Sequence, residues 1–308
     1  MKIRKLTLSS IGSAMLLFGA WSSPVAANPF CREGAFCPEY NIGPQTQAVF
    51  NAMFRDGDYD RAKELVGESI VAESSDPMAH AMNASLVYLY EDGMDEFKTH
   101  ATQTRETAEA LIPSNPLRGN LYAAVGHFLE GAHALQTQGA VRGTPEALSK
   151  LRQVFGHLEA AEAIEPSDPE LNIIKGFMDL MLAVNLPLAN PEDSLDRLRN
   201  QAGPDYLAYR GLAIGYRDLD RPDQALTEVN KALDITPDNP EVQYLKAQIY
   251  VENDQHQQSL EWFEKAWKQS DRLPGDLKKQ IKRECNKAAR EVNPEGSESA
   301  TLCEDSQS

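Results

Sequence analysis

The chain repeats itself at a spacing of 34 residues towards its C-terminal end. Shifting the sequence by that distance places identical residues opposite each other at several positions. The matched residues include Ala213 with Ala247, Tyr216 with Tyr250, Gln224 with Gln258, Leu226 with Leu260, Lys231 with Lys265 and Ala232 with Ala266. A fixed period of about this length is typical of proteins built from stacked copies of one supersecondary unit.

Within each copy, apolar residues recur at steps of three and four. Leu212 and Tyr216 form one such stripe, and Leu226 and Val229 form another, so each unit is predicted to be a pair of amphipathic helices. Neither helix can bury its stripe alone. Several pairs must therefore stack before a continuous core forms.

Prolines mark where the other pairs begin. Pro is tolerated in the first turn of a helix, and Asp or Asn before it can cap that helix. The starting prolines are those of Gly43-Pro44, Asp76-Pro77, Asn115-Pro116, Asp168-Pro169, Gly203-Pro204, Asn239-Pro240 and Leu273-Pro274. We predict an all-α protein of about six helix pairs, with an extended turn from Gly139 to Thr144 in the third and a capping helix after the sixth.

The stretch from Tyr206 to Asn239 resembles the tetratricopeptide repeat (TPR). The residues that carry the resemblance are Tyr209, Leu212-Ala213, Tyr216, Ala225, Val229 and Pro237. It is strong over residues 204–272, where 204–239 and 240–273 are the clearest repeats, and weaker over 44–203. The resemblance implies a right-handed superhelical solenoid whose first helices line a concave groove that binds segments of other proteins.

The same resemblance identifies candidate partner-binding residues in the fifth and sixth pairs. The groove-facing slots correspond to Arg210, Ile214, Arg217, Tyr244, Gln248 and Val251. These slots lack the Lys and Asn constellation of TPR domains that clamp a C-terminal carboxylate. The expected partner is therefore an unidentified protein or peptide of another kind.

Residues 1–27 have the pattern of a secretory signal peptide, with a basic start, an apolar stretch over 11–21 and small residues before Asn28. The apolar stretch is too short and interrupted for a membrane span, although an uncleaved anchor is the alternative. We expect export to the periplasm, with the thylakoid lumen or the extracellular medium as alternatives. A signal peptide joined to TPR units is similar to exported TPR proteins of Gram-negative bacteria and cyanobacteria.

The mature chain is expected to have three parts. A short cysteine-containing segment covers residues 28–43, the helical repeats cover 44–291, and a polar tail covers 292–308.

The four cysteines, Cys31, Cys37, Cys285 and Cys303, lie at the two extremes of the chain. In an oxidising compartment they are expected to form disulfides, and four cysteines allow three connectivities. We favour Cys31 with Cys37 and Cys285 with Cys303, because the ends of a solenoid are expected to lie far apart. A zinc site is the alternative, but the spacings fit no zinc pattern.

The sequence offers no recognisable catalytic machinery. It has no phosphate loop, no dinucleotide-binding fingerprint and no nucleophile elbow, and its six histidines form no metal-ligand pattern. The formal net charge of -16 argues against a nucleic-acid partner. We predict a protein without cofactor, metal or catalytic residues.

The fourth pair departs most from the repeat pattern. An apolar run over residues 177–188 precedes a second helix that is expected to be short, from about Pro191 to Asn200. The run is either buried core or an exposed docking patch.

The favoured function is that of an exported adaptor for a protein partner. The alternatives are a small-molecule-binding component associated with a transporter, with a cavity near Gly126, Gly131, Phe177 and Met181, and a self-associating envelope protein.

Overall fold

The computed structural model describes residues 28–32, 42–90, 93–185, 190–293 and 303, and its described secondary structure is helical throughout. The elements are α1 (Pro44–Phe50), the π-helical η1 (Asn51–Arg55), α2 (Tyr59–Ala72), α3 (Pro77–Tyr90), α4 (Met94–Leu111), α5 (Pro116–Ile164), α6 (Pro169–Asn185), α7 (Pro191–Asn200), α8 (Asp205–Asp218), α9 (Pro222–Ile235), α10 (Pro240–Glu252), α11 (His256–Lys268), the 3₁₀ turn η2 (Ser270–Arg272) and α12 (Gly275–Val292). The predicted all-α fold is confirmed.

The helices form six pairs followed by α12, as predicted. α1 with η1 pairs with α2, and the later pairs are α3 with α4, the two halves of α5, α6 with α7, α8 with α9, and α10 with α11. The halves of α5 run back along each other, since His157 Nδ1 lies 2.9 Å from Asn120 Oδ1. α7 is as short as the sequence predicts.

The prolines act as helix starts for the expected reason. α1, α3, α5, α6 and α10 each begin at a predicted proline, whereas α8 and α12 begin one residue after theirs. The Asn115 side chain accepts a hydrogen bond from the backbone N–H of Arg118, and Asn239 accepts from those of Glu241 and Val242. These amides have no acceptor within their own helix, so the caps fix where it starts.

The predicted extended turn from Gly139 to Thr144 was wrong. Only Gly139 leaves helical geometry, with φ 76°, and the helix resumes directly after it. Glycine adopts positive φ without steric cost, so one residue suffices to reverse the chain. Pro145 lies inside the second half of α5.

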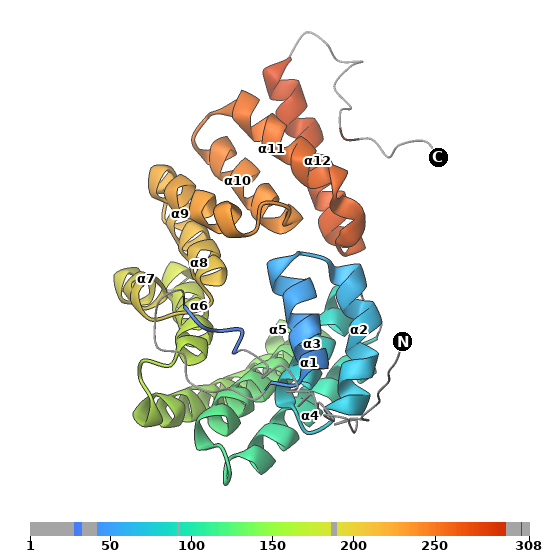
Figure 1. Cartoon of the computed structure of the whole chain (residues 1–308), viewed down its shortest axis with the longest axis vertical. Helices are drawn as coiled ribbons and strands as arrows, with labels where there is room; N and C mark the ends of the chain where they lie inside the picture. The colour runs from blue at the N-terminus through green and yellow to red at the C-terminus, as the bar shows by residue number, and fades with distance from the viewer. Residues whose placement is uncertain (1–27, 33–41, 91–92, 186–189, 294–302, 304–308) are drawn as a thin grey trace, which may run out of the picture.

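The two ends of the solenoid meet, which corrects the expectation that they lie far apart. Figure 1 shows the pairs following a ring, from α1 through α5 and α8, until the sixth pair and α12 come back close to the first pair. The turn η2 contacts α2 there. At this seam the Asn239 side-chain amide donates to the carbonyls of Phe54 (3.3 Å) and Arg55 (3.1 Å). Arg272 donates to the carbonyl of Asp56. The first pair therefore covers part of the face that an open TPR groove would present.

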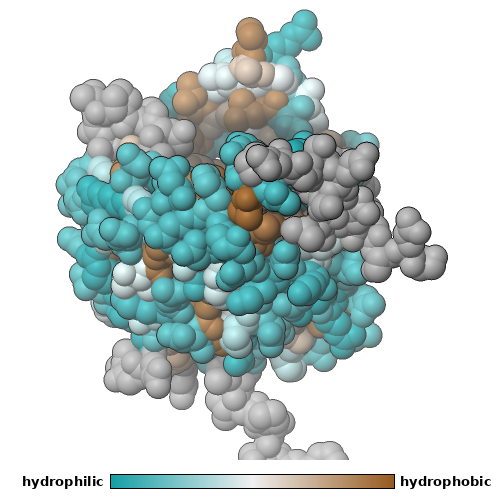
Figure 2. Space-filling view, turned by 90° about the horizontal axis from the view of Figure 1, so that it is seen from above, coloured by the Kyte–Doolittle hydropathy of each residue, from teal (hydrophilic) through white to brown (hydrophobic). Residues whose placement is uncertain are grey.

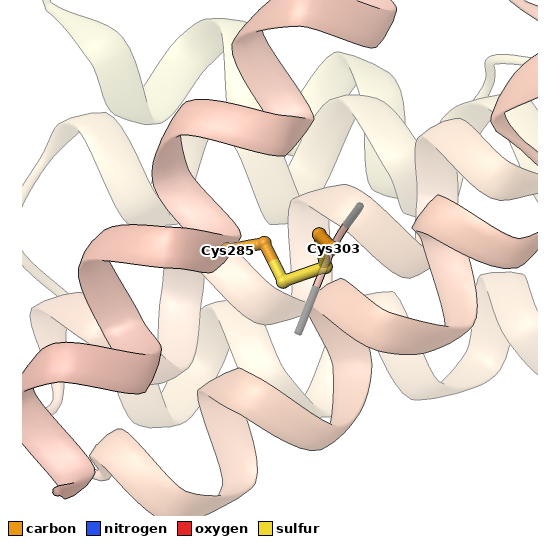
Figure 3. The surroundings of a disulfide bond; sticks show 2 residues. All are labelled: Cys285 and Cys303. Atoms are coloured by element: carbon orange, nitrogen blue, oxygen red, sulfur yellow. A yellow bond between two sulfur atoms is a disulfide. The ribbon is translucent and has the colours of Figure 1, made fainter. Parts of the chain in front are cut away.

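The predicted disulfide between Cys285 and Cys303 is present, and it ties α12 to a residue of the C-terminal tail (Figure 3). Both cysteines are fully buried. Cys31 is also disulfide-bonded. Its predicted partner, Cys37, lies outside the described residues, as does the predicted signal peptide.

Candidate functional site

An apolar cavity that is open to solvent lies on the inner side of the ring, and we call it the chamber. It has a volume of about 440 Å³ and is lined by side chains from α1, η1, α2, α3, α5, α6 and α8, together with Phe30 of the N-terminal segment. Five phenylalanines contribute to the lining: Phe30, Phe50, Phe54, Phe128 and Phe177. Its volume lies within the range of about 300–1,000 Å³ that is usual for small-molecule sites.

The N-terminal segment, residues 28–32, lies between α7 and α8 on one side and α1 on the other, and it contributes to the chamber. Arg32 binds the Asp205 carboxylate at 3.3 Å and the Arg199 carbonyl at 3.1 Å, which fixes the segment against α7 and α8. Phe30 then packs edge-on against Phe50, with ring centroids 5.0 Å apart. A residue outside the repeats thus supplies part of the wall.

Arg210 is the one charged side chain among the described residues that line the chamber. Its Nη1 donates to Oε2 of Glu241 at 3.0 Å, and the Tyr59 hydroxyl donates to the same oxygen at 2.8 Å. Burial and, less strongly, the nearby Glu241 carboxylate raise the pKa of Tyr59 well above its usual range. Tyr59 therefore stays a neutral donor, and Arg210 and Glu241 form a charge-neutral pair.

A second apolar hollow, which we call the cleft, lies between the two halves of α5 and the end of α6. It has a volume of about 310 Å³. Four large apolar side chains around it are between 39% and 51% exposed: Phe128, Leu135, Leu148 and Met181. Phe128 lines both the cleft and the chamber. The face drawn in Figure 2 is mostly hydrophilic with small separate hydrophobic patches, so such a cluster is distinctive.

A carboxylate network borders the cleft. Lys150, which lines the cleft, pairs with Glu130, and Arg105 Nε lies 2.9 Å from the same carboxylate. Burial alone would raise the pKa of Glu130, but the nearby side chains of His127, Lys150 and Arg105 lower it to about 2. The cleft therefore has an apolar floor and a charged, ion-paired edge.

Comparison with known families identifies one part of the chain. The family model described as "Tetratricopeptide repeat" matches residues 195–274. We call this stretch, which is similar to the tetratricopeptide repeat, the TPR region. It covers α8 to α11, where the 34-residue repeat was found, and TPR domains in general act as protein-interaction scaffolds and not as enzymes.

Two solved structures are distantly similar. One is the crystal structure of TTC0263, a thermophilic TPR protein of Thermus thermophilus, which is 17% identical to this chain with a TM-score of 0.31. The match covers 79% of this chain and 96% of that chain. The other is the crystal structure of the APC/C hetero-tetramer Cut9-Hcn1, which is 14% identical with a TM-score of 0.34. That match covers 79% of this chain and 49% of the other chain. No curated protein matches the chain.

The six slots predicted from the TPR resemblance do not form one open surface. Arg210 and Ile214 line the chamber. Tyr244 is buried, and Val251 is exposed at the end of α10.

The remaining two slots are engaged within the TPR region. Arg217 donates to the Gln248 side-chain oxygen at 2.8 Å, while the Gln248 amide donates to the Tyr244 hydroxyl at 2.8 Å and to Glu284 of α12 at 3.2 Å. Their role in partner binding remains a prediction, and the structure gives each an internal contact instead.

The sequence pattern did not predict most of the residues that line the chamber. Phe177 lines the chamber, whereas Gly131 and Met181 line the cleft. Gly126 has a packing role, because a Cβ there would lie 2.6 Å from the Arg105 backbone nitrogen. Phe30 and the residues of the first two pairs carry no local pattern that distinguishes a cavity wall from ordinary core.

A buried charge cluster stands behind the chamber wall. Arg118 donates to both oxygens of Asp168, at 2.7 and 2.8 Å, and its Nε lies 2.9 Å from Glu170. Tyr122, which lines the chamber, donates to Glu170. Burial raises the pKa of Glu170 to about 7, against the lowering effect of Arg118.

The described part of the chain offers neither a membrane span nor a metal site. Over those residues, no helix has the length and hydropathy needed to cross a bilayer. Histidine, cysteine, aspartate and glutamate side chains do not gather there in groups of three or more that could hold an ion.

Proposed function

We propose that the protein is an exported, non-catalytic scaffold that binds a protein partner in the periplasm. The observation that carries this proposal is the cleft, where Phe128, Leu135, Leu148 and Met181 stay partly exposed in a protein of strongly acidic composition. Contiguous exposed apolar side chains tend to mark interaction sites. The TPR region and the predicted signal peptide support the same function.

The cleft suits the apolar side chains of a partner segment. Its floor is apolar, and its edge carries Lys150 and Glu130, which an incoming segment can meet with backbone or polar groups. Interfaces of this kind combine an apolar centre with a polar rim. The shortness of α7 is consistent with the docking interpretation of the preceding apolar run, of which Met181 and Leu182 line the cleft.

Site-specific photo-crosslinking in the native host tests the docking surface. A photoreactive phenylalanine analogue at Leu148, in the cleft, should capture a defined second polypeptide. The matched control carries the same analogue at Val71, which is 84% exposed on α2 and remote from the cleft residues. Equal capture at both positions, or none at Leu148, would overturn the proposal.

Localisation has its own test. Release of the protein by osmotic shock, with a mature N-terminus at Asn28, is the expected result. Retention in the membrane fraction after a high-salt wash would contradict export as a free protein.

A second candidate function is the binding of a small molecule, in association with a transporter. The chamber favours it, because a cavity of this volume with an apolar lining is typical of ligand sites. The two functions use different cavities and can be tested separately.

A further inference from the structure

We propose that the chamber binds a small, largely apolar organic molecule with one neutral oxygen acceptor, such as an ester or ketone carbonyl, placed at Arg210. The inference rests on the second candidate function and not on the partner cleft. It defines the ligand by the chemistry of the chamber wall.

The apolar part of the assignment follows from the lining. Apart from Arg210, the chamber presents apolar and aromatic side chains with three hydroxyl-bearing residues, Ser85, Tyr59 and Tyr122. All three hydroxyls already donate hydrogen bonds, Tyr59 to Glu241, Tyr122 to Glu170 and Ser85 to the Ala81 carbonyl. Apolar cavities do not hold water well and bind apolar molecules readily.

The wall also suits variable ligand shapes. Met78, Met82 and Met178 contribute unbranched, polarisable side chains beside the phenylalanines. Methionine adapts to irregular apolar surfaces and makes favourable contacts with aromatic rings. The chamber is therefore expected to accept both chain-like and ring-containing molecules.

The polar end of the ligand is assigned from Arg210. A guanidinium has five N–H donors, and Arg210 directs Nη1 to Glu241, which leaves other donors for a ligand oxygen. Glu241 already neutralises the guanidinium charge. A ligand carboxylate would place a second negative charge beside Glu241 in an apolar site, so a neutral carbonyl is favoured.

The seam makes a small molecule a better occupant than a protein segment. Asn239 bonds to the Phe54 and Arg55 carbonyls, and Tyr59 bonds to Glu241 across the ring. These contacts place the first pair over the face where an extended peptide would lie along the fifth and sixth pairs.

Binding of the neutral fluorophore N-phenyl-1-naphthylamine to the mature protein tests the location. Ser85 of α3 lines the chamber, and Ser85→Phe would fill part of it without orphaning a buried donor, since the hydroxyl bonds only back to the Ala81 carbonyl. We expect at least a tenfold loss of affinity. The matched control, Ser149→Phe on the exposed face of α5, should bind like the wild type.

Further variants keep the test decisive. If Ser85→Phe fails to fold, Ala81→Leu narrows the same wall, because residues 81 and 85 share one helix face and both line the chamber. Leu148→Ser in the cleft should leave fluorophore binding unchanged. Unchanged affinity in a folded chamber variant, or loss in Leu148→Ser, would refute the chamber as the site. Failure of the wild type to bind would refute the second candidate function and leave the partner cleft standing.

Displacement of the fluorophore at pH 8 tests the chemistry of the polar end. Methyl laurate and laurate share one apolar chain, but only laurate carries a charge. Methyl laurate should displace at least tenfold more strongly. A stronger displacement by laurate would overturn the neutral-acceptor assignment.

Discussion

The TPR region and the divergent first four pairs differ in what their inward-facing side chains contact. In the TPR region, the groove-side residues Arg217, Gln248 and Tyr244 bond to one another and to α12. In the first four pairs, side chains of α1, α3, α5 and α6 line most of the chamber and all of the cleft, while α8 of the TPR region adds Leu207, Arg210 and Ile214 to the chamber. Most of the hollow surface therefore lies where the sequence departs from the regular repeat.

The largest expected effect lies in the divergent half. Arg118→Ala should lower the free energy of unfolding by about 3–5 kcal/mol, because it leaves the buried carboxylates of Asp168 and Glu170 without their cation. The control is Arg217→Ala in the TPR region, which is partly exposed and should cost less than about 1 kcal/mol. Urea denaturation measures both, and equal losses would remove the contrast between the halves.

The seam between the two halves gives the next effect. Asn239→Ala removes both a helix cap and two hydrogen bonds to the first pair, so a loss of about 2–3 kcal/mol is expected. Asn115→Ala removes a cap of α5 and should cost about 1 kcal/mol. Hydrogen exchange should also speed up in η1 for Asn239→Ala alone. Equal losses would show that the seam adds nothing to stability.

The stability of the divergent half should depend on pH through Glu170. The pKa of Glu170 is raised to about 7 in the folded protein, so the folded state holds this proton more tightly than the unfolded chain. Its contribution to stability is complete below about pH 4.5 and is lost as the pH rises through about 7. Glu170→Gln should flatten this part of the stability profile. An unchanged slope between pH 5 and 7.5 in thermal denaturation would contradict the assignment.

The smallest effect is expected at the cleft. Leu148→Ser alters a half-exposed side chain, so the free energy of unfolding should change by less than about 0.5 kcal/mol. Partner capture should nevertheless fall. A matched core variant in the TPR region, Leu212→Ala, removes a fully buried side chain and should cost about 2–5 kcal/mol. A comparable loss at Leu148 would show that the cleft is core and not a docking surface.

Local sequence rules explain why the helix pairs could be predicted. Prolines with capping neighbours, such as Asn115-Pro116 and Asn239-Pro240, act within one turn of the chain. The Cys285–Cys303 pairing was also predicted, although its supporting argument, that the ends lie far apart, was wrong. The turn after Gln138 was mispredicted, because Gly139 alone, with its positive φ, reverses the chain where a turn of six residues was expected.

The sequence by itself determined the helical pairs, their order and the terminal cap, because periodicity and capping are local properties. Only the tertiary structure decided that the ring closes, through side chains such as Asn239 and Arg272 that meet the first pair more than 180 residues away in the chain. The small rotation between neighbouring pairs accumulates over the whole solenoid. No short stretch of sequence encodes the accumulated rotation, and the chamber on the inner side of the ring is therefore a property of the folded chain.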